Sequence, residues 1–336
     1  MNTSPGSHIG PRLNKPRIIP RAAGQRLWLA PLLIAASLLL GACSTTRLAY
    51  NQAPGLAQWW INGQVNLSDA QSTQLREDID RFFQWHRRSE LPAYAALLLR
   101  WQSLATTDIS AEQACAEFDR MRARIDVATE RSLEPLARLA LQLSPEQLQY
   151  LQKKQADSLD EFDEDYLQGD TQERQRRRLD KAVDRSEQLY GRLNEAQREL
   201  VASGIRRSSF DAERSRTERL RRQDDLRQTV RAAQSQVLAQ TRASDERNGP
   251  GLIRSAQAAT LPSATATAVP LLRDFTRRLW ASPAPGYQAY SQTLVRQGCA
   301  QFAALHNSTS PAQRAHAVDV LKGYAADFQA LSRAQP

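Results

Sequence analysis

The stretch Leu143-Ser144-Pro145-Glu146-Gln147-Leu148 has every feature of a helix N-terminus. The Ser144 hydroxyl can accept a hydrogen bond from the third amide of the helix, while the Gln147 side chain reaches back to the Ser144 amide, which is the pattern called a capping box. Pro145 stands at the first helical position, where proline is tolerated. Leu143 and Leu148 have the spacing of a hydrophobic staple. The stretch therefore predicts a helix that begins at residue 145.

The same kind of helix start recurs along the chain. A Ser or Asn is followed three residues later by Gln at Ser68-Asp69-Ala70-Gln71, Ser110-Ala111-Glu112-Gln113, Asn194-Glu195-Ala196-Gln197 and Ser310-Pro311-Ala312-Gln313. Behind these starts the apolar residues recur at helical spacing, and no comparable run alternates apolar with polar residues. The pattern predicts an all-α fold, an irregular or elongated helical bundle of about eight to ten helices.

The expected helices span residues 54–61, 69–88, 92–105, 111–142, 145–167, 171–192, 195–245, 268–281, 287–306 and 311–333. Asn248-Gly249-Pro250-Gly251 and the Ala/Thr/Ser-rich stretch behind it predict a linker or long loop over residues 246–267. We therefore expect a helical bundle at residues 54–245 and C-terminal helices at residues 268–333 that pack on it.

The first 42 residues have the layout of a bacterial lipoprotein signal peptide. The apolar run at 27–42 is shorter than the roughly 20 residues that a membrane span needs, and it ends in Leu40-Gly41-Ala42-Cys43. It is preceded by the cations Arg12, Lys15, Arg17, Arg21 and Arg26. In signals of this class the Cys thiol receives a diacylglyceryl group, and the chain is cleaved before it. We expect cleavage between Ala42 and Cys43, lipidation of Cys43, and a lipidated tether at residues 43–53.

The formal net charge of +9 overstates the basicity of the mature chain, from which residues 1–42 are expected to be removed. Residues 1–42 hold five cations and no acid, so the mature chain carries 40 basic and 36 acidic groups. This balance does not favour nucleic acid as a partner. The stretch from Arg174 to Arg231 is rich in arginine interleaved with acids. It predicts a solvated, salt-bridged helix surface or, alternatively, a basic face for acidic lipid headgroups, lipopolysaccharide phosphates or unfolded clients.

Two cysteines remain once Cys43 is lipidated. An oxidising envelope permits Cys115 and Cys299 to form a disulfide, which would close a loop of 184 residues. On the chain-entropy model such a loop could stabilise the fold by about 4 to 5 kcal/mol. The alternative is two buried thiols that act as small apolar groups.

No motif in the chain carries recognisable catalytic chemistry. His86, His306 and His316 stand in no metal-ligand spacing, and there is no nucleophile elbow, phosphate loop or dinucleotide fingerprint. The acidic run from Asp160 to Asp165 lacks the spacing of a calcium loop and predicts solvated helix surface. We therefore expect no catalytic residue, metal ion, cofactor or small-molecule substrate, and no enzymatic activity.

His86, Trp59 and Trp60 are expected to have structural roles. His86 lies on the apolar face of its helix and is expected to be packed and hydrogen-bonded. Trp59 and Trp60 are expected to pack in the core or between helices, and the alternative is contact with a membrane interface.

The N-terminal third resembles an uncharacterised family of Gram-negative bacterial lipoproteins, a domain-of-unknown-function family. The resemblance rests on Cys43-Ser44-Thr45-Thr46-Arg47-Leu48-Ala49-Tyr50-Asn51, Trp59-Trp60, Val65-Asn66-Leu67-Ser68-Asp69-Ala70-Gln71 and Trp85-His86-Arg87-Arg88, and it extends over most of residues 43 to about 330. It implies a helical lipoprotein without a known activity. In lipoproteins of this type a residue other than Asp after the lipidated Cys implies release to the outer membrane, and that residue is Ser44.

A weaker similarity links the helix starts to the Spy-like periplasmic chaperones, whose hallmark is Leu-Thr-x-x-Gln. Leu67-Ser68-Asp69-Ala70-Gln71, Leu143-Ser144-Pro145-Glu146-Gln147 and Leu193-Asn194-Glu195-Ala196-Gln197 come close to it, although none has the Thr. A capping box is also a general solution for the unpaired amides of a helix start.

The leading functional hypothesis is an outer-membrane-anchored lipoprotein on the periplasmic face that is not an enzyme. It would bind protein partners, unfolded clients or envelope components in a chaperone-like or assembly-accessory role. One alternative is an envelope hydrolase, which predicts a deep pocket with two or more convergent carboxylates of perturbed pKa. The other is a structural spacer between the membrane and the cell wall.

Overall fold

The computed structural model describes residues 45–248 and 253–334, and it confirms that they form an all-α helical bundle. Within these two ranges there are ten helices and no strand. They are α2 (Thr45–Val65), α3 (Asp69–Leu104), α4 (Ala111–Gln142), α5 (Pro145–Tyr166), α6 (Thr171–Tyr190), α7 (Glu195–Arg207), α8 (Ala212–Asn248), α9 (Ile253–Trp280), α10 (Tyr287–Asn307) and α11 (Pro311–Arg333). Residues 1–42 and Cys43, on which the signal-peptide and lipidation predictions fall, lie outside the described residues.

All five predicted capping boxes are present. In each, the N-cap side chain accepts from the amide of the Gln three residues on, and the Gln side chain accepts from the N-cap amide. A sixth box, which was not predicted, joins Asp170 to Glu173 at the start of α6. Local hydrogen bonding therefore decides where most of these helices begin.

The capping glutamines also join distant helix starts in pairs. Gln71 Nε2 donates to Gln147 Oε1 at 3.1 Å and to the Gln142 carbonyl at 2.8 Å, while Gln147 Nε2 donates to the Asn66 carbonyl at 2.9 Å. The starts of α3 and α5 are held together in this way. Their boxes thus join distant parts of the chain in addition to capping.

A second pair repeats this arrangement at the starts of α7 and α11. Gln197 Nε2 donates to Gln313 Oε1 at 2.8 Å and to the Ser308 carbonyl at 3.0 Å, while Gln313 Nε2 donates to the Arg192 carbonyl at 3.1 Å. Each glutamine donates to a backbone carbonyl in or beside the loop that precedes the other helix. Four of the five Ser/Asn-x-x-Gln capping boxes therefore also have a role in tertiary structure.

Two predicted helix boundaries were wrong. The helices expected at 69–88 and 92–105 form one continuous α3 with Pro92 inside it, because Glu90, Leu91, Ala95 and Leu98 are buried on both sides of the proline and packing compensates for its missing amide. The single helix expected at 195–245 is instead two. α7 ends at Arg207, and the Asp211 carboxylate caps α8 by accepting from the Arg214 amide at 3.0 Å.

The linker predicted at 246–267 was also wrong over residues 253–267, which form the first half of α9. This segment is rich in alanine, a strong helix former. Thr265 and Ala268 are buried, and α9 packs on α4 and α8, so tertiary contacts tolerate the internal Pro262 and Pro270. The described residues from Thr46 onwards cluster as one compact unit, to which the C-terminal helices belong.

The predicted tether at 43–53 is helical wherever it is described, since α2 begins at Thr45. Arg47 Nε donates to Asp327 Oδ1 of α11 at 2.8 Å, and the Tyr50 hydroxyl and His86 Nδ1 of α3 are 2.9 Å apart. Arg87 Nη2 donates to Asn51 Oδ1 at 2.9 Å. The helical signal in residues 45–53 is weak because this first part of α2 contacts α3 and α11 through polar groups, whereas the apolar contacts of α2 come later, at Ile61 and Val65.

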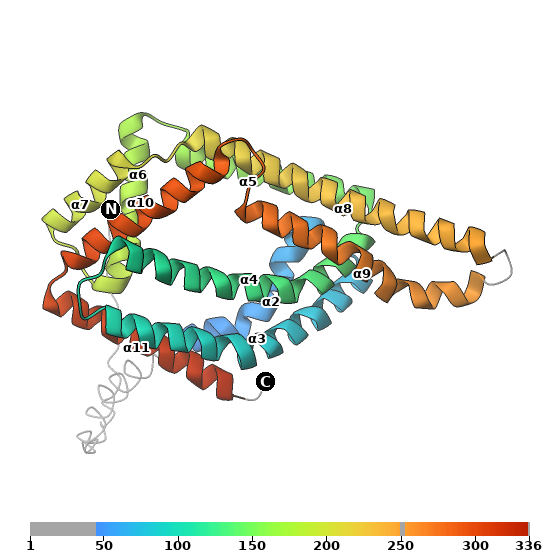
Figure 1. The fold of residues 1–336 in the computed structure, drawn as a ribbon, viewed down its shortest axis with the longest axis horizontal. Helices are drawn as coiled ribbons and strands as arrows, with labels where there is room; N and C mark the ends of the chain where they lie inside the picture. Colours follow the sequence, from blue (N-terminus) through green and yellow to red (C-terminus); the bar gives the residue numbers. More distant parts are fainter. Residues whose placement is uncertain (1–44, 249–252, 335–336) are drawn as a thin grey trace, which may run out of the picture. The chain divides into compact units, whose positions relative to one another are not determined.

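The helices pack around three apolar clusters. α11 lies along α3, and α9 lies along α8 and α4 (Figure 1). The largest cluster joins α3, α6, α7, α10 and α11 around Leu98, Tyr190 and Val201. A second joins α2, α4, α5 and α8, and a third joins α4, α8 and α9.

Of the two alternatives for the cysteines, the structure contains the disulfide. Cys115 of α4 and Cys299 of α10 are bonded, with their Cα atoms 5.3 Å apart. The two cysteines are 184 residues apart in sequence, so the bond joins helices from distant parts of the chain.

Candidate functional site: an apolar cavity between α3, α4 and α10

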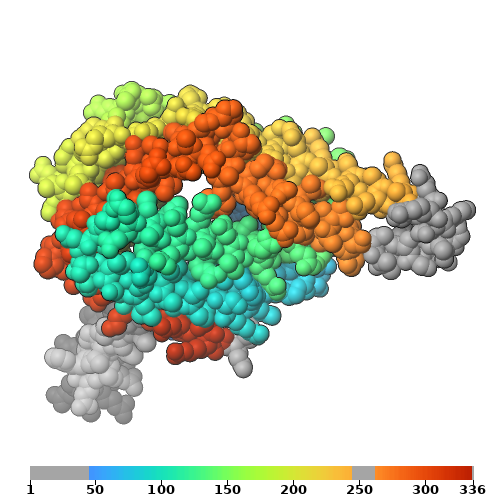
Figure 2. Space-filling model, viewed as in Figure 1, coloured from blue at the N-terminus to red at the C-terminus, as the bar shows by residue number. Residues whose placement is uncertain are grey.

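An apolar cavity of about 630 Å³ lies within the described part of the bundle. Its walls come from α3, α4, α6, α10 and α11, so five helices surround it. Figure 2 shows the surface hollowed between α4 and α10. Cavities of this size between the helices of a bundle are a common setting for ligand binding.

The rim of the cavity carries large apolar side chains that remain in contact with solvent. Phe118 of α4 and Phe302 of α10 are each 43% exposed, Tyr324 of α11 is 45% exposed, and Val295 is 36% exposed. Deeper in the cavity, Leu98 and Leu321 are buried. Exposed apolar groups that gather around a cavity mark an interaction site rather than ordinary surface.

The polar groups at the bottom of the cavity already have partners. His306 is 2% exposed, and its Nε2 lies 2.8 Å from the Thr107 carbonyl, which can only accept. Nε2 therefore donates to this carbonyl, and Nδ1 lies within hydrogen-bond distance of the Tyr190 hydroxyl, at 3.0 Å. Burial raises the pKa of Tyr190, which keeps its hydroxyl protonated. Both ring nitrogens of His306 and the Tyr190 hydroxyl are therefore hydrogen-bonded at the bottom of the cavity.

Glu117 is the only carboxylate among the described residues that line the cavity, and both of its oxygens already accept hydrogen bonds. Its Oε1 accepts from Arg100 Nε at 2.6 Å, and its Oε2 accepts from the Trp101 indole at 2.9 Å. Among the lining side chains, the groups left without a hydrogen bond are Gln113 Nε2 and the Tyr324 hydroxyl. A ligand in the cavity would therefore contact mainly hydrocarbon side chains. Few polar groups are available to pair with a charged group or with the N–H and C=O groups of a peptide.

The disulfide and a glycine define the α10 wall. Cys299 lines the cavity and is bonded to Cys115, so α10 is fixed against α4 at this depth. Gly298, the residue before it, also lines the cavity, and a Cβ added there would meet no atom within 4 Å. The absence of a side chain at Gly298 keeps this part of the cavity empty.

The buried carboxylates of the bundle are paired with arginines. Burial alone would raise the pKa of Glu218, but hydrogen bonds from Arg221, Arg222 and Ser282 outweigh it and lower that pKa. In the same way, Arg278 and Arg221 lower the pKa of Asp225 against the effect of burial. Lowered pKa values hold these groups ionised, whereas a general acid needs a raised one. The carboxylate constellation that the hydrolase alternative predicts is not found among the described residues.

The other residues singled out in the sequence lie apart from the cavity. His86 is packed among Tyr50, Phe82 and Tyr94, and burial lowers its pKa. In the acidic run, Asp163 pairs with Arg216 and Asp165 with Lys181. Within residues 45–248 and 253–334, no three His, Cys, Asp or Glu side chains form a group that could hold a metal ion.

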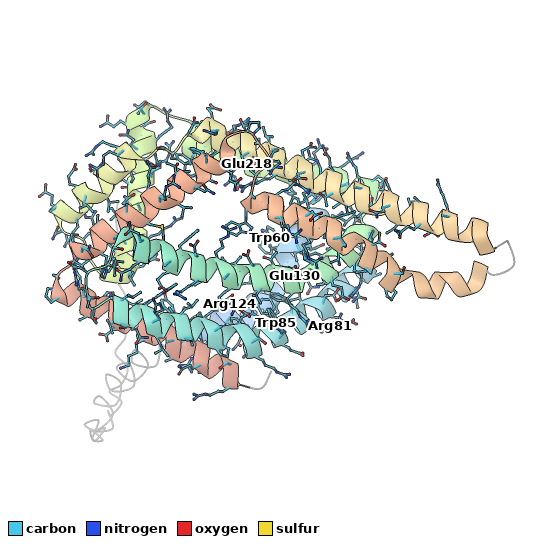
Figure 3. The ribbon with its side chains drawn as sticks, in the orientation of Figure 1. Trp60, Arg81, Trp85, Arg124, Glu130 and Glu218 are labelled. Carbon is cyan, nitrogen blue, oxygen red and sulfur yellow. A yellow bond between two sulfur atoms is a disulfide. The ribbon has the colours of Figure 1, made fainter. Side chains whose placement is uncertain are left out.

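The prediction that Trp59 and Trp60 pack in the core was wrong. Trp59 is 73% exposed and Trp60, labelled in Figure 3, is 60% exposed. α2 meets the bundle through the opposite side, where Tyr50, Ile61 and Val65 lie. At 100° per residue, the exposed Leu48, Leu56, Trp59 and Trp60 share one face.

Phe302 of α10 and Tyr324 of α11 are among the apolar residues that recur at helical spacing, and this spacing does not show that they border a cavity. The signal that could have been used is Gly298 beside Cys299, a small residue at the apolar face of a helix tied to another helix. None of the helices described in the structure is both long enough and apolar enough to cross a membrane.

Comparison with known proteins identifies the family. Residues 64–242 match a family of unknown function, DUF6279, and because the match covers more than half of the chain, the protein belongs to this family. This confirms the predicted resemblance to a domain-of-unknown-function family. No curated protein matches the chain, Spy-like chaperones included, and no solved structure does.

Proposed function

We propose that the protein is an outer-membrane-anchored periplasmic lipoprotein that acts as a binding module rather than as an enzyme. Its cavity takes the hydrocarbon chain of an envelope component, either a membrane lipid or an acylated partner protein, in an assembly-accessory role. The observation that carries this proposal is the solvent-open apolar cavity with Phe118, Phe302 and Tyr324 at its rim.

The chemistry of the cavity favours an acyl chain over an extended peptide. A peptide backbone brings N–H and C=O groups that need partners, and the walls leave only Gln113 Nε2 and the Tyr324 hydroxyl without one. A hydrocarbon chain has no such requirement. The cavity is also surrounded by five helices, whereas a docked helix requires an open groove.

The exposed face of α2 supports placement at a membrane. Arg47 is the only charged residue within α2, and it pairs with Asp327, so the face that carries Leu48, Leu56, Trp59 and Trp60 is uncharged. Tryptophan favours the boundary between lipid and water. If Cys43 is lipidated, α2 begins two residues after the anchor, and this face starts within reach of the bilayer.

Filling the cavity is expected to abolish ligand binding without unfolding the protein. Gly298→Leu puts an isobutyl group into open space on the cavity wall. We expect it to weaken binding of the fluorescent fatty acid cis-parinaric acid at least tenfold, which corresponds to about 1.4 kcal/mol of binding free energy. Binding is measured by fluorescence titration of the full-length lipoprotein in detergent.

The matched control is Gly323→Leu in α11, where an added Cβ also meets no atom within 4 Å but which does not line the cavity. Both substitutions replace a helical glycine, which should raise the stability by about 0.5 to 1 kcal/mol. Equal affinity in the two variants would exclude this cavity as the binding site.

Crosslinking in intact cells distinguishes the two sources of the acyl chain. With the photoreactive amino acid p-benzoylphenylalanine at Phe302, we expect an adduct that Gly298→Leu removes. An adduct of lipid mass identifies a membrane lipid, whereas a protein adduct identifies an acylated partner. The control position is Leu238, which is 58% exposed on α8. Labelling at Leu238 that matches labelling at Phe302 would contradict the proposal.

The membrane contact of α2 is tested by fluorescence quenching. In liposomes that contain brominated phosphatidylcholine, we expect Trp59→Phe/Trp60→Phe to remove most of the quenched tryptophan emission of the reconstituted lipoprotein, because these indoles lie at the bilayer surface. Trp280→Phe, which removes another partly exposed indole on α9, should leave the quenching unchanged. The reverse pattern would place a different face at the membrane.

A further inference from the structure

The volume of the apolar cavity limits how much hydrocarbon it can hold. The cavity measures about 630 Å³. A methylene group is about as large as a water molecule, which takes about 30 Å³ of the liquid, so the cavity has room for roughly 20 such groups. Membrane acyl chains have about 14 to 18 carbons, which matches a hydrocarbon core of about 30 Å. One chain therefore fits, whereas two chains of about 14 carbons would need about 840 Å³.

The walls of the cavity oppose the widening that a second chain would require. Cys299 on one wall is bonded to Cys115, and α11 lies along α3 on the other side. At the bottom, Glu117 and the pair His306 and Tyr190 are hydrogen-bonded. A second chain would have to separate packed helices and break these hydrogen bonds, and both changes cost stability.

The rim of the cavity offers no charge to a lipid headgroup. The exposed residues among those that line the cavity are all uncharged, namely Gln113, Phe118, Val295, Gly298, Phe302 and Tyr324. Glu117 is buried below them and pairs with Arg100 at 2.6 Å. A polar headgroup stays in water at the rim, because burying it without a partner is unfavourable. Recognition therefore depends on the number and the length of the acyl chains.

We propose, on the basis of the function proposed above, that the ligand is a lipid with a single acyl chain of about 14 to 18 carbons. Free fatty acids and lysophospholipids are the two sources of this chemistry, one unbranched hydrocarbon chain with a polar head. A diacyl phospholipid and the diacylglyceryl group of a lipoprotein each carry two chains. One of the two would remain outside the cavity and gain no apolar contact there.

Chain number is tested by native mass spectrometry of the full-length lipoprotein, because the mass of an adduct identifies the lipid and its copy number. The protein is kept in CHAPS, a detergent with a rigid steroid instead of an acyl chain. It is offered equal amounts of palmitoyl lysophosphatidylcholine and dipalmitoyl phosphatidylcholine, which share the headgroup and the chain. We expect one copy of the single-chain lipid, at least tenfold more abundant than the diacyl adduct.

The matched variants show whether an adduct lies in the cavity. Gly298→Leu, which fills open space on the cavity wall, should remove the adduct, and Gly323→Leu, which lies outside the cavity, should retain it. The lipid that remains on the protein when it is purified from its membrane in CHAPS distinguishes the sources. Its mass is either that of a fatty acid or that of a lysophospholipid.

Chain length is tested by competition of saturated fatty acids with cis-parinaric acid in the same detergent. Since each buried methylene adds about 0.8 kcal/mol, we expect the affinity to rise up to about fourfold per carbon and to stop rising at about 18 carbons, when the cavity is full. The isobutyl group of Gly298→Leu occupies the space of about four carbons, so this variant should stop at a chain that much shorter.

The possible results separate this proposal from the proposed function. If no fatty acid of any length competes, both are wrong. If fatty acids compete but the diacyl lipid forms an equally abundant adduct that Gly298→Leu removes, the cavity binds acyl chains and the limit to one chain is wrong. An affinity that keeps rising beyond about 20 carbons, or a limit that Gly298→Leu does not shift, would also overturn the single-chain proposal.

Discussion

Replacing Cys115 and Cys299 together with alanine is expected to lower the free energy of unfolding by about 5 kcal/mol, more than the loss of a helix cap or of a single buried hydrogen bond. The bond closes a loop of 184 residues, and without it the unfolded chain gains the freedom that the loop removes. Because a single domain is stable by only about 5 to 15 kcal/mol, this loss is a large fraction of the total. Urea denaturation of the full-length protein in detergent measures it.

A comparison of the oxidised and reduced wild type separates the cross-link from packing. Reduction with dithiothreitol keeps both side chains, so the reduced protein should lose nearly as much stability as the double alanine variant. Cys115→Ala alone should behave like the reduced protein, since it also breaks the bond. If reduction shifts the unfolding free energy by less than about 1 kcal/mol, the bond adds little beyond what the packing of α4 on α10 already provides.

Reduction should also affect the cavity more than the rest of the bundle. Cys299 lines the cavity, and its bond fixes α10 against α4 across one wall. The pairs Gln71–Gln147 and Gln197–Gln313 lie at other helix starts and do not depend on it. We therefore expect reduction of this bond to weaken the affinity for an acyl chain and to leave the overall helix content unchanged.

The helix starts could be predicted from the sequence because their causes are local. Ser144, Pro145 and Gln147 satisfy the free amides of α5 within one turn, and no distant residue is required. The same reasoning would have found the start of α8, since Asp211 three residues before Arg214 is an ordinary N-cap. The break between α7 and α8 is not evident in the sequence pattern, because arginine-rich helical sequence continues on both sides of it.

The cavity could not be predicted, because periodicity shows that a helix face is apolar without showing what covers it. Phe302 and Tyr324 have the spacing of core residues, yet each is nearly half exposed since five helices leave space between them. Trp59 and Trp60 were misjudged for the same reason. The continuity of α3 through Pro92 and of α9 through Pro262 likewise depends on packing against other helices.

The second large effect is expected from breaking one glutamine pair. Gln197 is 2% exposed, and Gln197→Leu removes the acceptor for the Asn194 amide and the donor to the Ser308 carbonyl. It also leaves Gln313 without its partner. Since a buried polar group left without a partner costs about 1 to 3 kcal/mol, we expect Gln197→Leu to lower the free energy of unfolding by about 2 to 4 kcal/mol. Urea denaturation of the full-length protein measures this change.

Gln113→Leu is the matched control, because Gln113 caps α4 in the same way but is exposed and pairs with no other glutamine. Its loss should cost about 1 kcal/mol, the usual value of a helix cap. The double variant Gln197→Leu/Gln313→Leu should be more stable than the sum of its single changes implies, by at least about 0.5 kcal/mol, because neither partner is then left unpaired. Strict additivity would mean that the two boxes act as separate caps, and the recurring motif would then have only its local role.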